Sequence, residues 1–261
     1  MSDTSSYEVF AVKYAERDAR RPEHFIGGDP HDVPMPMDYF VWAIVGNGQT
    51  WVVDTGFEAA DAERRRRRLL RSASDALELI GVDASRAPNV ILTHLHYDHV
   101  GGFGQFPNAR FHVQDRELAF ATGRHMTVAD QRHGFTASHI ADVVVAVHQG
   151  RVGFHDGDIE LAPGLSIHHV GGHTDGLQVV RVETGIGCLV LASDATHYYE
   201  NLEAVRPFPI VFDVDAMVAG YERIRALAGR DGVIVPGHDP QVFERHAAAD
   251  ASLAGIAVRL A

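Results

Sequence analysis

Residues 93–102 read Thr-His-Leu-His-Tyr-Asp-His-Val-Gly-Gly, which places four side chains able to bind a transition metal within six positions. These side chains are His94, His96, Asp98 and His99. They follow the apolar run 89–92, which predicts a buried strand, and the glycine pair behind them allows a sharp turn. We therefore expect the imidazoles to converge on a loop at a strand end, where functional groups are commonly held.

The residue types indicate which kind of metal site this is. Neutral imidazole and carboxylate suit Zn²⁺, Mn²⁺ and Fe, whereas a closed structural zinc site usually takes several cysteines. The sequence has a single cysteine, which excludes a closed thiolate cage.

Three further candidate ligands occur downstream, each after an apolar, strand-like run and beside a small residue. His173 follows the run 165–170, Asp194 follows 188–192, and His238 follows 232–235. Four strands would then each deliver ligands from one end, which is how a metal centre is assembled at the edge of sheets.

In this order of ligands the sequence resembles the metallo-β-lactamase superfamily, whose motif is His-x-His-x-Asp-His followed by a separate His, Asp and His. Residues 53–56, Val-Asp-Thr-Gly, also match the family's Asp-x-Gly turn, in which Asp54 supports the metal loop from behind. The resemblance runs from about residue 51 to residue 238.

The resemblance implies a site for two divalent metal ions, with zinc as the first choice and Mn, Fe or Co as alternatives. One metal would be bound by His94, His96 and His173, the other by Asp98, His99 and His238, with Asp194 bridging the two. Such a pair makes a hydroxide nucleophile at neutral pH, so the implied reaction is hydrolysis of a lactone, ester-like or amide carbonyl. Asp98 is expected to pass a proton to the leaving group.

Within the superfamily the sequence looks most like the N-acyl homoserine lactonases, which degrade quorum signals. The irregular segment before the Asp54 strand and the sequence Ser-Asp-Ala-Thr-His-Tyr-Tyr at 193–199 support this. Those lactonases place a Tyr that contacts the lactone carbonyl three residues after the bridging Asp. Here that position is His197, with Tyr198 next to it, so we expect His197 or Tyr198 to make the contact.

Four alternatives stay open at this point. The substrate could be another lactone or cyclic ester, or the protein could be a glyoxalase II-like thioesterase, which shares all seven ligands. That group usually has a basic carboxy-terminal segment, and here the tail after His238 carries only Arg245 and Arg259. A redox role as in the diiron flavoproteins is disfavoured because those proteins have Glu in place of His96. A metal-binding scaffold without catalysis would keep the ligands but show no metal-dependent turnover.

Length and hydrophobic pattern predict one α/β domain over residues 1–261. The fold implied by the resemblance is a four-layer αββα sandwich. Strands are expected at 7–14, 39–45, 50–53, 90–93, 110–113, 165–170, 177–182, 188–192 and 233–235. Helices are expected at 57–80, 114–122, 213–228 and 241–254.

Two segments have the composition of a substrate pocket. Residues 25–39 are irregular and contain Met-Pro-Met at 35–37, where flexible thioethers suit an apolar binding surface, although they could equally fill the core. Residues 120–148 lie between the metal motif and His173 and are expected to form a cap or a homodimer contact.

The charge and hydropathy of the chain favour a small molecule as its binding partner. A net charge of −12 argues against nucleic acid, and no apolar run reaches the roughly 18 residues of a membrane helix. Residues 1–14 lack a secretory signal pattern and there is one cysteine, which favours the cytoplasm. The five arginines 64–68 are interpreted as a solvated helical face, with an interface or an anion site as the alternative.

Overall fold

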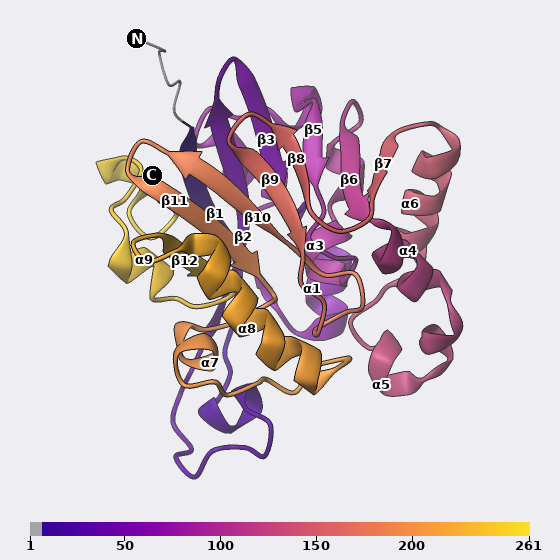
Figure 1. Ribbon diagram of the computed structural model, residues 1–261, viewed down its shortest axis with the longest axis vertical. Helices are drawn as coiled ribbons and strands as arrows, with labels where there is room; N and C mark the ends of the chain where they lie inside the picture. The colour runs from indigo at the N-terminus through magenta and orange to yellow at the C-terminus, as the bar shows by residue number, and fades with distance from the viewer. Residues whose placement is uncertain (1–6) are drawn as a thin grey trace.

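The structure is a computed structural model that describes residues 7–261 and consists of two stacked β-sheets with helices outside them (Figure 1). The first six residues, which are part of the segment 1–14 considered above for a signal sequence, lie outside the described range. The larger sheet contains β1 (Glu8–Arg17), β2 (Met37–Gly46), β3 (Gln49–Val53), β4 (Arg68–Leu69), β5 (Asn89–Ile91), β6 (Arg110–Gln114), β7 (Val152–His155) and β13 (Ala257–Arg259). The smaller sheet contains β8 (Ile159–Ala162), β9 (Leu165–His169), β10 (Gln178–Thr184), β11 (Gly187–Ser193) and β12 (Val233–Pro236).

The strand order explains why several loops meet at one edge of the molecule. The larger sheet runs β13-β1-β2-β3-β5-β6-β7, with β4 paired to β1, and the smaller runs β12-β11-β10-β9-β8. Strands β3, β5, β6 and β7 are mutually parallel, as are β11 and β12, so their carboxyl ends point the same way within each sheet. Loops after parallel strands lie together at that edge, where α/β proteins place their ligand sites.

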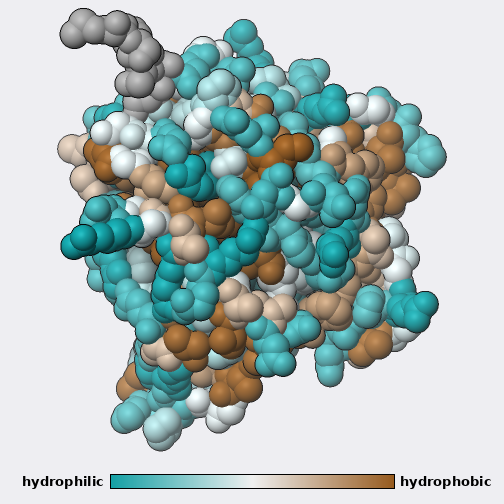
Figure 2. All heavy atoms as spheres, viewed as in Figure 1, coloured by the Kyte–Doolittle hydropathy of each residue, from teal (hydrophilic) through white to brown (hydrophobic). Residues whose placement is uncertain are grey.

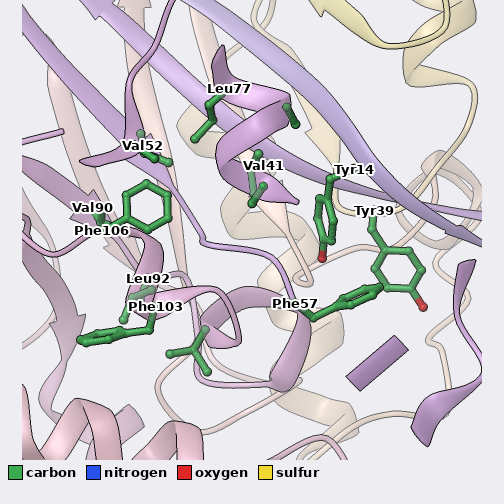
Figure 3. Close-up of a cluster of buried hydrophobic side chains, with 14 of the residues drawn as sticks. Tyr14, Tyr39, Val41, Val52, Phe57, Leu77, Val90, Leu92, Phe103 and Phe106 are labelled. Carbon is green, nitrogen blue, oxygen red and sulfur yellow. The ribbon is translucent and has the colours of Figure 1, made fainter. Parts of the chain in front are cut away.

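Three apolar cores separate the four layers. Between the sheets lie inward side chains such as Trp42 and Leu191. The other face of the larger sheet packs against α2 (Ala73–Glu78) and α6 (Ala137–His148), with Leu77 next to the rings shown in Figure 3. The other face of the smaller sheet is covered by α8 (Val214–Ala228), through Ile224. The predicted αββα sandwich is therefore confirmed.

The remaining helices are short and lie between strands or near the chain end. They are α1 (Ala59–Arg65), α3 (Tyr97–Val100), α4 (Asp115–Thr122), α5 (Ala129–Arg132), α7 (Tyr199–Glu203) and α9 (Val242–Arg245). The helices expected at 114–122 and 213–228 correspond to α4 and α8, and all nine expected strands are present, with ends shifted by a few residues.

The single helix expected over 57–80 is wrong. Helix α1 ends where Arg66 adopts the left-handed conformation, with a φ of 55°. The chain then extends into β4, which pairs with β1, before Ser72 begins α2 by accepting a hydrogen bond from the Asp75 backbone N–H at 3.0 Å. Sheet pairing and a new N-cap thus override a continuous helical pattern.

The helix expected over 241–254 is also wrong beyond its first turn. Helix α9 is four residues long, and the segment behind it forms a bridge between Ala248 and Val258. The Asp250 side chain accepts from the Ser252 backbone N–H at 2.8 Å and starts a short 3-10 turn. The short strands β4, β7, β8 and β13 were not predicted, because runs of two to four residues carry little periodicity.

The surface carries both polar and apolar side chains. On the face shown in Figure 2, apolar side chains are scattered among polar ones. Within residues 7–261 no helix has the length and apolarity needed to span a bilayer.

Candidate metal centre

Each predicted ligand lies on a segment that follows a strand, either a loop or, for Asp98 and His99, the short helix α3. His94, His96, Asp98 and His99 follow β5, His173 follows β9, Asp194 follows β11, and His238 follows β12. The loop before His173 needs a glycine at position 172, where φ is 86° and a Cβ atom would lie 2.6 Å from the Met217 backbone nitrogen. The tight turn therefore brings His173 over the end of the smaller sheet, facing the motif on the larger one.

The first group of ligands is formed by three buried imidazoles. His173 Nε2 lies 3.1 Å from His94 Nε2 and 2.9 Å from His96 Nδ1. Burial lowers the pKa of both His94 and His96 well below the ordinary histidine value, and the neighbouring imidazoles lower them further. Neutral imidazole is the form that binds a metal.

The second group lies on the other side of Asp194. Asp98 Oδ2 is 3.8 Å from His99 Nε2 and 3.8 Å from His238 Nε2. The two oxygens of Asp194 face different groups: Oδ1 lies 3.0 Å from His238 Nε2 and 3.4 Å from His99 Nε2, whereas Oδ2 lies 3.3 Å from His173 Nε2. Asp194 thus stands between two sets of ligands, one oxygen toward each.

The donors fit a pair of metal ions. Within each of the two groups, one ligand atom per residue lies within 4.8 Å of the others. Among the described residues, His99 Nε2 and Asp194 Oδ1 are buried without a hydrogen-bond partner, although burying a polar atom unpaired is costly. Cations placed between the two groups would satisfy both atoms, and the nitrogen and oxygen donor set suits zinc, manganese, iron or cobalt.

Acceptors behind the imidazoles fix their orientation. His99 Nδ1 lies 2.7 Å from Asp54 Oδ2, His238 Nδ1 lies 2.9 Å from the Asp38 carbonyl oxygen, and His173 Nδ1 lies 2.6 Å from the Ile210 carbonyl oxygen. A proton on each Nδ1 leaves Nε2 with a free lone pair that points into the centre. Asp54 also accepts from the Thr93 backbone N–H at 2.8 Å, so it supports the motif loop as expected.

Glu117 is a buried carboxylate of α4 that the sequence reasoning did not find. Its Oε1 accepts from the Leu95 backbone N–H at 2.8 Å, and its Oε2 accepts from the Thr174 hydroxyl at 2.7 Å and the Gly176 N–H at 3.1 Å. Burial raises its pKa to about 7, while these donors hold the pKa down. The side chain joins the loop of His94 and His96 to the loop of His173, and its position after a strand-like run was the only signal in the sequence.

His197 and Tyr198, the two predicted substrate contacts, lie in different places. His197 lines the pocket in front of the metal ligands, with Nε2 3.0 Å from Asp194 Oδ2 and its ring stacked on Phe208. Burial lowers the pKa of His197 to about 3, so it is neutral. The Tyr198 hydroxyl instead donates to the Pro36 carbonyl oxygen at 3.1 Å and is absent from the pocket wall, so the contact expected of Tyr198 is not available in this arrangement.

Both segments expected to supply pocket walls do so in part. Met37 and Tyr39, at the end of segment 25–39, line the pocket, whereas Met35 packs on the core. From segment 120–148, His133 and Gly134 line the pocket. The dimer contact considered for this segment stays a prediction.

Gly134 touches one of the ligands directly. A Cβ atom at this position would lie 2.4 Å from His96 Cδ2, so the ring of His96 rests against bare backbone. The neighbouring Phe135 ring meets the same imidazole edge-on, with centroids 4.5 Å apart. Segment 120–148 therefore forms a wall of the site at His96.

Three more pocket residues were missed: Tyr97, Arg65 and Arg67. Tyr97 lay inside the quoted motif but between ligands, and the two arginines were assigned to a solvated helix. Arg67 Nε donates to the Tyr97 hydroxyl at 3.0 Å, which ties the arginine run to the metal motif.

The chain is similar to known lactonases over part of its length. The chain is 28% identical over 165 residues to the N-acyl homoserine lactonase AiiA of Bacillus thuringiensis subsp. kurstaki, covering 62% of this chain and 60% of that protein. It is 32% identical over 179 residues to the N-acyl homoserine lactonase AttM of Azorhizobium caulinodans, covering 64% of each. The matches thus span less than two thirds of these relatives.

A solved structure described as a quorum-quenching N-acyl homoserine lactone lactonase superposes with a TM-score of 0.77 at 21% identity, covering 92% of this chain and 95% of that one. At this identity the likeness concerns the fold. The family model of the metallo-beta-lactamase superfamily matches residues 35–238, which is more than half of the sequence. With the αββα sandwich and the ligand loops at its strand ends, this match establishes that the chain belongs to the metallo-beta-lactamase superfamily.

Proposed function

We propose that this protein is a metal-dependent hydrolase that opens lactone rings, with N-acyl homoserine lactones as the first substrate class. The proposal is supported by the lactonase relatives and by a site whose donors suit two divalent cations, with zinc as the first choice. A small-molecule substrate is consistent with a pocket whose walls come from the strands β1 and β2, from loops and from short helices.

The main observation behind the proposal is that Asp194 lies between two groups of ligands. Its Oδ1 faces His99 and His238, and its Oδ2 faces His173. A carboxylate held between two such groups is the arrangement that a hydrolytic pair of metals requires.

Two metals, when bound, would supply an activated water and polarise the carbonyl of the substrate. The carboxylate of Asp98 lies at the pocket wall, where it can take the proton of the attacking water and return it to the leaving oxygen. His197 lines the same pocket and, being neutral, carries one N–H, which can donate to the substrate oxygen only when it does not donate to Asp194 Oδ2, 3.0 Å from its Nε2. Phe208 holds the ring of His197 in place by stacking at a centroid distance of 3.5 Å.

The test is hydrolysis of a panel together with metal content measured on the same sample. The panel contains N-acyl homoserine lactones of short and long chain, simple γ- and δ-lactones and a glutathione thioester. We expect lactone turnover with about two metals per chain, lost on chelation. Turnover of the thioester alone would move the assignment to a glyoxalase II-like thioesterase, and two bound metals without any turnover would refute the proposed substrate class.

A further inference from the structure

The five arginines 64–68 do not form one exposed helical face. Because Arg66 is left-handed and the chain then becomes extended, the run does not continue as one helix. Arg64 and Arg68 are exposed and form ion pairs with Asp61 and Glu16, respectively. Arg66 is also exposed, whereas the remaining two arginines are half-buried and line the pocket of the metal centre.

Arg65 is anchored by its surroundings but keeps an unused donor. Its guanidinium lies 3.9 Å from the centre of the Tyr97 ring, and its Nη1 donates to the His133 carbonyl oxygen at 2.9 Å. Its Nε is buried and has no hydrogen-bond partner among the described residues.

Arg67 lies beside Arg65 and is held in the same way. Its Nε donates to the Tyr97 hydroxyl, and its Nη1 donates to the Arg65 carbonyl oxygen at 2.6 Å. Within residues 7–261, neither Arg65 nor Arg67 has a carboxylate oxygen within 4 Å, whereas Arg17 on the same pocket wall is paired with Glu23. Two adjacent guanidinium groups therefore make no direct ion pair, although Asp98 and Asp61 act on them over a longer distance, in a chain whose net charge is −12.

The two arginines also line a second cavity next to the metal pocket. A surface cavity of about 610 Å³ is lined by arginines 64–67 and by residues of the segment 133–137. This cavity and the pocket of the metal ligands share Arg65, Arg67 and His133 as a common wall. A molecule whose reacting carbonyl lies at Asp194 and whose far end enters this cavity would pass both guanidinium groups.

We propose that Arg65 and Arg67 form a carboxylate-binding subsite, and that the preferred substrate carries a carboxylate on the part remote from the bond that is broken. The planar fork of arginine matches a carboxylate, and an ion pair at a half-buried site gains more than one in open water. This inference rests on the proposed lactone hydrolysis and makes it narrower, because a simple acyl chain would leave both charges unpaired.

The test compares two lactones that differ only at the far end of the acyl chain. N-hexanoyl homoserine lactone ends in a methyl group, and N-adipoyl homoserine lactone has the same chain length and ends in a carboxylate. We expect the wild type to have a kcat/KM about tenfold higher for the adipoyl compound. Arg65→Gln and Arg67→Gln should each lower the adipoyl value about tenfold more than the hexanoyl value.

The matched control is Arg230→Gln, which removes the same charge from an exposed position outside both cavities and should leave the ratio of the two kcat/KM values unchanged. Arg67→Lys keeps the charge but not the fork, so its ratio should lie between those of wild type and Arg67→Gln. Equal turnover of both lactones by the wild type would overturn the proposal. So would equal losses on both substrates in the Gln variants, since the arginines would then serve the fold or the reaction.

Binding of adipate to the metal-loaded protein, measured by titration calorimetry, separates the subsite from the reaction. Weaker adipate binding in Arg65→Gln and Arg67→Gln, with wild-type binding in Arg230→Gln, would support the subsite even if no lactone were hydrolysed. Absence of adipate binding, or equal binding by all variants, would overturn the subsite whatever lactones the protein opens.

Discussion

Replacing Glu117 by Gln tests whether this buried carboxylate holds the ligand loops together. The side chain accepts three hydrogen bonds, two of them from the backbone N–H groups of Leu95 and Gly176. Gln has one acceptor oxygen, so its NH₂ group must face at least one of those N–H donors. Leaving one buried N–H unpaired should lower the free energy of unfolding by about 1–3 kcal/mol, and Glu117→Ala should cost about 2–6 kcal/mol.

Glu117→Gln should also weaken metal binding, because its partner Leu95 lies between two metal ligands in the sequence and its partner Thr174 directly follows a third. Losing a residue that orients ligands typically costs about 10- to 100-fold in metal affinity. The assay is competitive metal titration at pH 8 and urea unfolding at pH 5 and pH 8. Burial raises the pKa of Glu117 to about 7, so the ionised carboxylate lowers the stability of the wild type as the pH rises, and the loss caused by Gln should be largest at pH 5 and smaller at pH 8. The matched control is Glu63→Gln on the exposed surface of α1, which should change the unfolding free energy by less than about 0.5 kcal/mol.

One outcome would refute this reasoning: a Glu117→Gln protein with the unfolding free energy and the metal affinity of the Glu63→Gln control. The three hydrogen bonds would then add nothing to the loops. A loss of stability with unchanged metal affinity would show that Glu117 supports α4 but does not position the ligands.

Three other predictions concern the pocket itself. Asp194→Asn should lose metal and lower hydrolysis on the order of 10³-fold, because a neutral amide replaces the carboxylate between the two ligand groups; metal analysis and turnover on one sample check this. His197→Phe should keep the metal, since the ring stacks on Phe208 and its Nε2 faces Asp194 rather than both ligand groups, but lower turnover about tenfold by loss of a hydrogen bond; metal loss would show that His197 is a ligand. Gly134→Ala should displace the ring of His96 and reduce metal affinity, whereas Gly104→Ala, where a Cβ atom meets nothing within 4 Å, should leave it unchanged in the same titration.

The parts of the fold that the sequence predicts are those set by local patterns. Strands of five or more residues with a buried face, and ligands placed directly after them, can be recognised without knowledge of the tertiary structure. The turn at Asp54 belongs to this class, since both its position after β3 and its support of the motif were expected. The long helix α8 was likewise predicted almost to the residue, because its apolar face and its Asp213 cap agree.

What the sequence could not supply depends on pairing between distant segments. The helix expected over 57–80 is broken because β4 pairs with β1, more than fifty residues earlier in the chain. That break decides where Arg65 and Arg67 face, so the wrong helix also hid two pocket residues. Tyr198 was misjudged for a similar reason: only the folded chain brings the Pro36 carbonyl oxygen to its hydroxyl.

The walls of the pocket therefore come from two different parts of the fold, and the backbone of Tyr97 links the two parts. The metal side comes from strand ends of both sheets, whereas the side facing the substrate comes from the α1–β4 junction and the segment 120–148. The Tyr97 backbone N–H donates to the Gly134 carbonyl oxygen at 2.9 Å, and Arg65 donates to the carbonyl oxygen of His133 next to it. A displacement of the substrate wall thus also displaces the metal motif through the backbone of Tyr97. Substitutions in the wall should therefore be tolerated only where the new side chain does not contact the imidazole of His96, as one at Gly134 would.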